Sequence, residues 1–431
     1  MLERATRSKL LRSALCLLLL APSAARAQTQ TPGQSLEPRP KPAFGSSLER
    51  LKWDAGQKRA VEVAPAPAKD GGGGVEEDEV VRVETSLVVC DVLVLDAKGK
   101  AVAGLKREDF LIIEDGRPQE VGAFALGDSA NVARSIVLVI DYSGSMRPFL
   151  ENSIEAAKTL VDKLSPRDRM AVVTDDVELL ADFTRDKRLL KEKLEWLLRK
   201  ATSNESGYPT RFGRSRQYSA LMATLRELFD EEDTRPIVIF QTDGDELGAL
   251  HDSPLPPPVP PGVSPEAYRA ALERSQRAFS IADVFREAER SRATIYTVIP
   301  GVRLIGLKPG EEQAKTKELR RELEKYRAPG STYLPARDLW LEETIRRTAP
   351  QQTALYGLSK LTGGWTNFLE EPSQAAGIYA SIFSDIGRRY VVGFYPTNRE
   401  RDGKRRHVQI EVRGHPEYTV WGRKSYYAPG P

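Results

Sequence analysis

The stretch Ile140-Asp141-Tyr142-Ser143-Gly144-Ser145-Met146 decides the fold that the sequence predicts. It follows the apolar run 135–140, which is typical of a strand buried on both faces, and a helical pattern over 150–164 comes after it. In an open parallel sheet, ligands bind beyond the carboxyl ends of the strands. Gly144 allows a tight turn. We therefore expect Asp141, Ser143 and Ser145 to face one centre at that edge.

A second acidic loop follows another apolar run, 236–240. Its sequence is Gln241-Thr242-Asp243-Gly244-Asp245-Glu246, and it offers Asp243 at the end of a second buried strand. Carboxylate and hydroxyl oxygens suit a hard divalent cation. The alternative reading of each loop by itself is structural, because serines cap helices and Asp-Gly forms turns.

Strand and helix patterns alternate through the middle of the chain, which predicts an α/β fold with a mostly parallel sheet and helices on both faces. The further strands are expected at 170–174, 177–183 (at an edge), 294–299 and 364–369. The further helices are expected at 187–199, 218–230, 280–291, 351–361 and 373–388.

The run Asp141-Tyr142-Ser143-Gly144-Ser145 resembles the D-x-S-x-S motif of the von Willebrand factor type A (vWA) domain. The resemblance implies a Rossmann-like, doubly wound sheet and a metal-ion-dependent adhesion site (MIDAS). That site adds a Thr from a second loop and an Asp from a third, which Asp243 matches. Ser219, in Ser219-Ala220-Leu221, takes the Thr position, and Thr210 in the long approach loop is the alternative.

The whole layout also resembles the secreted VWFA-related acidobacterial-type family. Two runs carry this resemblance, namely Glu114-Asp115-Gly116-Arg117-Pro118-Gln119 and Tyr390-Val391-Val392-Gly393-Phe394-Tyr395-Pro396. The layout implies a small β module, a vWA domain and a C-terminal β tail. We assign these parts to 81–130, 131–388 and 389–431, with inserts in the vWA domain at about 250–279 and 303–350.

The first 27 residues have the pattern of a signal peptide. Basic residues precede a leucine-rich run, and Ala25-Arg26-Ala27 is a typical cleavage site, so we expect cleavage after Ala27. The apolar run is short for a membrane span, which needs about 20 residues, and no later segment is long and apolar enough. Residues 28–80 are rich in Pro, Gly and charge and predict a disordered linker.

Charge and cysteine content restrict the function further. The 431-residue chain has a formal net charge of +3, and removing residues 1–27 takes away five positive charges and one negative, which leaves −1. No basic field remains to attract nucleic acid. Cys90 is the single cysteine after the signal peptide, so the exported chain has no internal disulfide. Its strand-like surroundings favour a buried thiol.

The inserts are expected to be surface features. The proline-rich run 254–261 favours a stiff loop, and the charged segment 309–327 favours a solvated helix over a binding arm.

The resemblance implies that Asp141, Ser143, Ser145, Ser219 and Asp243 hold a divalent cation, Mg²⁺ first, with Mn²⁺ or Ca²⁺ as substitutes. An open position would accept an Asp or Glu from a partner. We expect a secreted or periplasmic, non-enzymatic, adhesion-type protein-binding module. One alternative is an extracytoplasmic hydrolase, for which His251 in the loop after Asp243 is a candidate, although the chain has no G-x-S-x-G elbow and no zinc-type His spacing. The other is a metal-free structural or assembly component.

Overall fold

The computed structural model describes residues 42–63, 87–127, 132–203, 211, 213–230, 235–246, 259, 262–275, 278–325 and 339–430. The predicted signal peptide, Thr210, His251 and nearly all of the proline-rich run lie outside these ranges.

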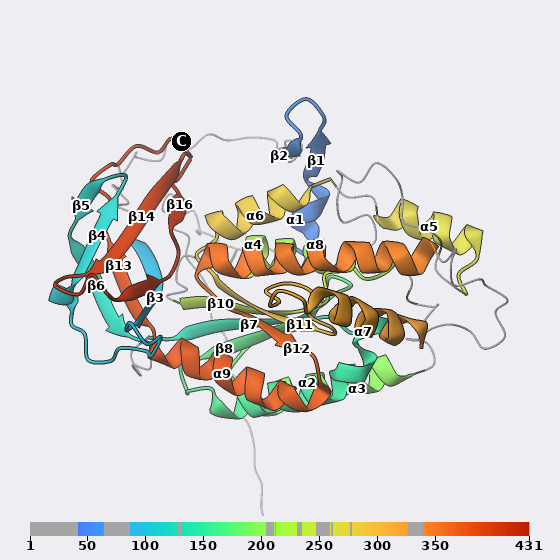
Figure 1. The fold of residues 1–431 in the computed structure, drawn as a ribbon. Coiled ribbons are helices and arrows are strands. Elements are labelled where there is room, and N and C mark those ends of the chain that lie inside the picture. Colours follow the sequence, from blue (N-terminus) through green and yellow to red (C-terminus); the bar gives the residue numbers. More distant parts are fainter. Residues whose placement is uncertain are drawn as a thin grey trace, which may run out of the picture. The chain divides into compact units, whose positions relative to one another are not determined.

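A six-stranded sheet forms the centre of the α/β region, in the order β12-β11-β10-β7-β8-β9 (Figure 1). Every neighbouring pair is parallel except β8 and β9, so the predicted α/β class and the edge position of the third strand are confirmed. The strands are β7 (Arg134–Ile140), β8 (Arg169–Thr174), β9 (Glu178–Thr184), β10 (Arg235–Gln241), β11 (Thr294–Pro300) and β12 (Thr366–Leu369).

Helices cover both faces of this sheet (Figure 1). One face packs against α2 (Arg147–Lys163), α3 (Lys187–Thr202) and α9 (Ala375–Arg388). The other packs against α4 (Gln217–Glu227), α6 (Ile281–Arg290) and α8 (Leu339–Thr362). In β7, Ile136 and Leu138 face the first layer and Val137 and Val139 face the second, because successive side chains of a strand alternate. Burial on both faces thus explains why residues 135–140 form a continuous apolar run.

The predicted β module and β tail combine into one β-sandwich. Its sheets have the orders β15-β3-β13-β6 and β16-β14-β4-β5. The expected division into a separate β module and β tail is therefore wrong. Strand β13 lies between β3 and β6, and β14 pairs with β4. Their facing apolar sides form a shared core. The strands are β3 (Val88–Leu95), β4 (Phe110–Glu114), β5 (Arg117–Gln119), β6 (Val121–Leu126), β13 (Tyr390–Phe394), β14 (Arg405–Val412), β15 (Thr419–Trp421) and β16 (Ser425–Tyr427).

Buried arginines join the sandwich to the α/β region. Arg235, at the start of β10, makes two 2.9 Å contacts with the Asp91 carboxylate of β3 and donates to the carbonyls of Gly127 and Ile386. Arg423 donates to the carbonyls of Glu289, in the last turn of α6, and Ala293, just before β11. Since a buried charge must be paired and hydrogen-bonded, these contacts fix the two regions to each other.

Residues 43–63 correct the prediction of a disordered linker over 28–80. They form α1 (Ser46–Glu49) and the hairpin of β1 (Leu51–Asp54) and β2 (Arg59–Glu62). Phe44, Leu48 and Leu51 belong to the core on the α4 and α6 face of the sheet. The backbone N–H groups of Gly45 and Ser47 also donate to the Glu227 carboxylate. A few apolar residues within a polar segment are enough to anchor it.

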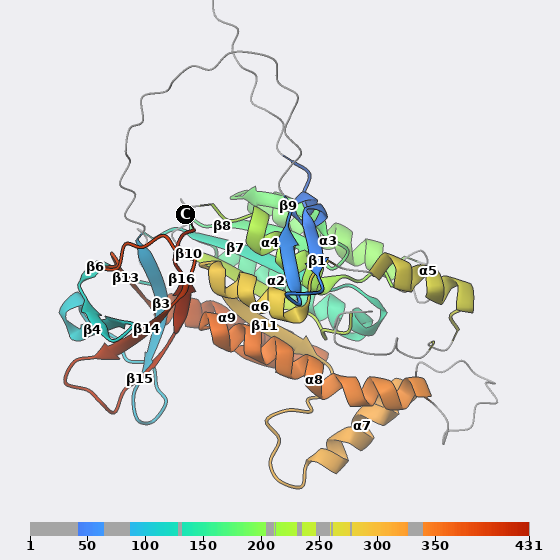
Figure 2. The ribbon, with the colours of Figure 1, turned by 90° about the horizontal axis from the view of Figure 1, so that it is seen from above.

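The inserts carry their own helices. The first contains α5 (Pro265–Ser275), and the second contains α7 (Glu312–Glu324), which confirms a helix in the charged segment. Helix α8 begins at Leu339 and runs through Pro350, whereas the predicted helix began at 351. Figure 2 shows α7 beside the first half of α8. Short 3₁₀ turns lie at Arg107–Asp109, Gly144–Met146 and Pro372–Gln374. None of the helices described is both long and apolar enough to span a bilayer.

Cys90 is buried in β3, with 1% of its surface exposed, and burial raises the pKa of its thiol to about 11. Near pH 8 only about one thiol in a thousand is then ionised, and the thiolate is the reactive form. We predict that iodoacetamide leaves Cys90 unmodified in the folded protein and alkylates it rapidly in urea, as measured by mass spectrometry of the peptide that contains Cys90. Rapid alkylation without denaturant would contradict the buried position.

Candidate metal centre

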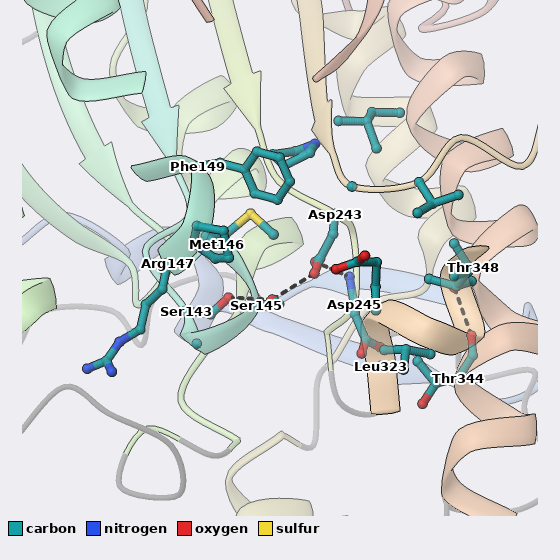
Figure 3. A pocket seen from close by; sticks show the side chains of 18 of the residues that line it. Ser143, Ser145, Met146, Arg147, Phe149, Asp243, Asp245, Leu323, Thr344 and Thr348 are labelled. Atoms are coloured by element: carbon teal, nitrogen blue, oxygen red, sulfur yellow. Dashed lines mark hydrogen bonds between the residues drawn. The ribbon is translucent and has the colours of Figure 1, made fainter. Parts of the chain in front are cut away.

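Hydroxyl and carboxylate groups from two strand ends meet at the carboxyl edge of the sheet. Asp141 and Ser143 follow β7, Ser145 lies in the 3₁₀ turn that leads into α2, and Asp243 follows β10. Figure 3 shows Ser143, Ser145 and Asp243 pointing toward one another. The Ser143 and Ser145 Oγ atoms are 3.2 Å apart, and the Ser145 hydroxyl donates to Asp243 Oδ2 at 2.8 Å. The structure therefore brings the two predicted loops together.

Asp141 is buried beneath these groups and organises the loops. Its Oδ1 accepts from the backbone N–H of Ser143 at 2.8 Å. Its Oδ2 accepts from Gln217 Nε2 at 2.9 Å and from the Thr242 hydroxyl at 3.0 Å. Each contact comes from a different segment of the chain. One carboxylate thus fixes the β7 loop, the start of α4 and the β10 loop relative to each other.

The structure separates Ser219 from the cavity beside these groups. Ser219 is the third residue of α4, is 2% exposed and is not among the residues that line the cavity. Ser215, in the loop just before α4, does line it, and its hydroxyl donates to Asp175 Oδ2 at 2.6 Å. The sequence analysis did not identify Ser215. Its position in Gly213-Arg214-Ser215, directly before a predicted helix, could have indicated it, because a hydroxyl in such a loop can face the sheet edge.

Asp175, which follows β8, is a further acidic residue that sequence reasoning missed. It accepts from the backbone N–H of Tyr142 at 3.2 Å and pairs with Arg211 Nη2 at 3.1 Å. The Arg211 guanidinium lies over the Tyr142 ring, 3.4 Å from its centre, a favourable cation–π arrangement. Asp175 and Arg211 thus hold the Ser215 loop against the D-x-S-x-S loop.

The carboxylates of the site repel each other. Burial, followed by the charges of Asp141 and Asp245, raises the pKa of Asp243 above its ordinary value. Burial and the charge of Asp141 also raise the pKa of Asp175, although Arg211 acts in the opposite direction. Like charges close together and shielded from water disfavour ionisation. A cation placed among them would relieve this repulsion.

The donor set of this site consists of serine hydroxyl and aspartate carboxylate oxygens. In the described ranges, no group of three or more His, Cys, Asp or Glu side chains is placed to hold a metal ion. A cation here would rest on Asp141, Asp243 and serine hydroxyls. Such a set fits Mg²⁺, which takes oxygen ligands, needs one or two carboxylates and keeps several waters.

A cavity of about 710 Å³ opens beside the serines. Ser143, Ser145 and Asp243 line it on one side, and residues of α7 and α8 line the other (Figure 3). Its volume falls in the range of small-ligand sites, about 300–1,000 Å³.

The two histidines that the structure describes lie in the sandwich. His407 is exposed on β14, and His415 pairs with Glu417 and stacks on Tyr418. Neither lines the cavity. The described residues therefore offer no Ser–His pair at the site.

An open, doubly wound sheet with a D-x-S-x-S loop at its carboxyl edge defines the class of domain. Residues 136–246 match the model of the von Willebrand factor type A domain, so the chain contains a vWA domain. A comparison with curated proteins finds no match.

Solved structures to which this chain is similar include BatB from Bacteroides thetaiotaomicron, at 15% identity and a TM-score of 0.32, covering 60% of this chain and 100% of that one. Another is the vWF domain of the type V pili tip protein Mfa5 from Porphyromonas gingivalis, at 16% identity and a TM-score of 0.32, covering 60% of this chain and 96% of that one. An aerotolerance-related membrane protein from Bacteroides fragilis matches at 14% identity and a TM-score of 0.31, covering 60% of this chain and 100% of that one.

Proposed function

We propose that this chain is an exported, non-enzymatic protein-binding module whose vWA domain holds a divalent cation, Mg²⁺ first. The cation bridges to an Asp or Glu carboxylate of a partner protein. Export rests on the signal peptide predicted for residues 1–27. The match of residues 136–246 to the vWA model supports the type of module.

The spacing of the oxygen atoms carries the proposal. Neighbouring ligands of an octahedral Mg²⁺ ion lie about 2.9 Å apart, because the Mg–O distance is about 2.0–2.1 Å. The Ser143–Ser145 and Ser145–Asp243 oxygen pairs lie 3.2 Å and 2.8 Å apart. The small number of carboxylates supports the choice of Mg²⁺, because Mg²⁺ binds through one or two carboxylates and keeps several waters, whereas Ca²⁺ takes 6–8 oxygen ligands.

Ser215 is the better candidate for the hydroxyl of the second loop. It lines the cavity and is tied to Asp175, whereas Ser219 lies inside α4. We propose that Ser143, Ser145 and Ser215 supply hydroxyls, and that Asp141 and Asp243 bind directly or through water and accept hydrogen bonds from the hydroxyls. Because few of these ligands are charged, the cation keeps much of its positive charge. It can therefore bind a further carboxylate from the partner, as the proposed function requires.

An affinity pull-down with the mature chain tests this function. We expect the chain to retain partner proteins when Mg²⁺ is present and to release them on addition of a chelator. A chain with Asp141→Asn should retain none of the same proteins. Binding that survives both the chelator and the substitution would refute a metal-bridged contact.

A further inference from the structure

We propose that the cavity beside the metal centre is a second subsite, which receives a large apolar side chain of the same partner. The ligand is then a peptide segment that carries one acidic residue for the cation and a large apolar residue within a few positions of it. This inference rests on the proposed function and narrows the chemistry of the partner.

The cavity walls are apolar close to the metal-binding groups. Met146 and Phe149, at the start of α2, line the side near Ser145. Leu319 and Leu323 of α7 line the opposite side, together with Trp340 of α8 (Figure 3 labels Leu323). Burying an apolar side chain against these walls is favourable, because the apolar surfaces of both leave water. A cation at the serines would sit at the polar end of this cavity.

The cavity wall opposite Ser145 comes from the second insert, and it contacts the loop that carries Asp243. Asp245, two residues after Asp243, accepts from Gln351 Nε2 at 2.9 Å and pairs with Arg347 at 3.1 Å. Lys315 of α7 pairs with Glu370, just after β12, at 2.6 Å. Contacts on both sides hold α7 and α8 over the carboxyl edge of the sheet. The cavity is thus formed before any ligand arrives, which reduces the ordering that binding requires.

The charges around the cavity are mixed. Glu318, Glu322 and Glu370 line the wall, but Glu318 and Glu370 share Lys315, and Glu322 pairs with Lys325. The basic residues of the lining are Arg147, Arg211, Lys325 and Arg347. Because most of these charges are paired, the cation is the group that attracts an acidic residue, and the apolar walls favour a neutral side chain. A single acidic residue beside a neutral apolar one matches both ends of the cavity.

A random heptapeptide library displayed on phage tests the inference on the full chain. Phage bound in Mg²⁺ are eluted with a chelator and sequenced. We expect enrichment of peptides in which aspartate or glutamate lies within a few positions of phenylalanine, tryptophan, leucine or isoleucine. Chelator-eluted peptides that are acidic but show no apolar enrichment would overturn this inference and leave the proposed function intact. No chelator-eluted enrichment at all would overturn the proposed function itself.

Matched variants locate the subsite, with a synthetic peptide from the enriched pool as the probe. Leu323→Ala should weaken its binding about tenfold, because a buried leucine contributes on this scale. Thr348→Trp, which fills the cavity from α8, should weaken it at least as much. Leu339→Ala is the control, since Leu339 is 67% exposed and does not line the cavity. Unchanged affinity in both cavity variants, or an equal loss in Leu339→Ala, would refute the subsite.

Discussion

Asp141→Asn is expected to weaken Mg²⁺ binding about 100-fold or more while the protein stays folded. Replacing a residue that supports metal ligands typically reduces affinity 10- to 100-fold, and Asp141 also supplies charge to the centre. The asparagine has the shape of the aspartate, so the backbone N–H of Ser143 keeps its acceptor. Gln217 can turn its amide, because its Oε1 is buried without a partner and would accept from the new side chain.

Two measurements check this prediction. Calorimetric titration should give a binding isotherm for the wild type and none for Asp141→Asn at the same concentrations. Thermal unfolding without metal should show no loss of stability, because the substitution removes a charge that acts unfavourably on Asp175 and Asp243. Magnesium should then raise the melting temperature of the wild type alone. An unchanged isotherm for the variant would refute the proposed centre.

Ser215→Ala and Ser219→Ala are matched controls in the same titration. Both remove one hydroxyl from neighbouring turns of the chain. We expect Ser215→Ala to weaken Mg²⁺ binding and Ser219→Ala to leave it unchanged, because Ser215 alone of the two lines the cavity. The reverse order would restore the original assignment of Ser219.

The second large effect is expected from Arg235→Met, which should lower the free energy of unfolding by about 3–5 kcal/mol. The substitution keeps most of the side-chain volume but removes the partner of Asp91 and the donors to two carbonyls. Arg235 is 2% exposed, so water cannot replace the lost contacts without opening the interface. Urea unfolding followed by circular dichroism measures the change.

Arg346→Met provides the comparison for Arg235→Met. Arg346 also makes two hydrogen bonds to one carboxylate, that of Glu343, but it lies on the exposed face of α8. Exposed pairs contribute little because water and salt screen them, so we expect its free energy of unfolding to match the wild type. Arg235→Lys should fall between the wild type and Arg235→Met. A loss equal to that of Arg346→Met would show that the arginine does not join the two regions.

The sequence predicts the central sheet because burial on both faces leaves a clear pattern. The apolar runs 135–140 and 236–240 became the adjacent central strands β7 and β10, in parallel register. Neighbouring parallel strands end at the same edge, so the loops that carry Ser145 and Asp243 had to meet there, and they do. Their roles as metal ligands remain predictions.

Other features depend on contacts that no local pattern reveals. The pairing of β3 with β13 joins segments about 300 residues apart, as the Arg389 to Asp91 contact across 298 positions shows. The charged segment 309–327 was expected to be a solvated helix, yet Leu319 and Leu323 of α7 face the cavity. Most residues of this segment are charged and exposed, so its overall composition gave no indication that two leucines line a cavity. Ser215 was missed because a neighbouring helix pattern, Ser219-Ala220-Leu221, matched the family better.

Because the sandwich combines early and late strands of the chain, it can be completed only at a late stage of synthesis. Strands β3 to β6 are made before the vWA domain, but their partners β13 and β14 are made after it. Until then these early strands have open edges and an uncovered apolar side, a state prone to aggregation. A chain cut short after α9 would keep every strand of the central sheet and still expose half of a sandwich. The early strands are therefore covered only after residues 390–427, which form β13 to β16, have been made.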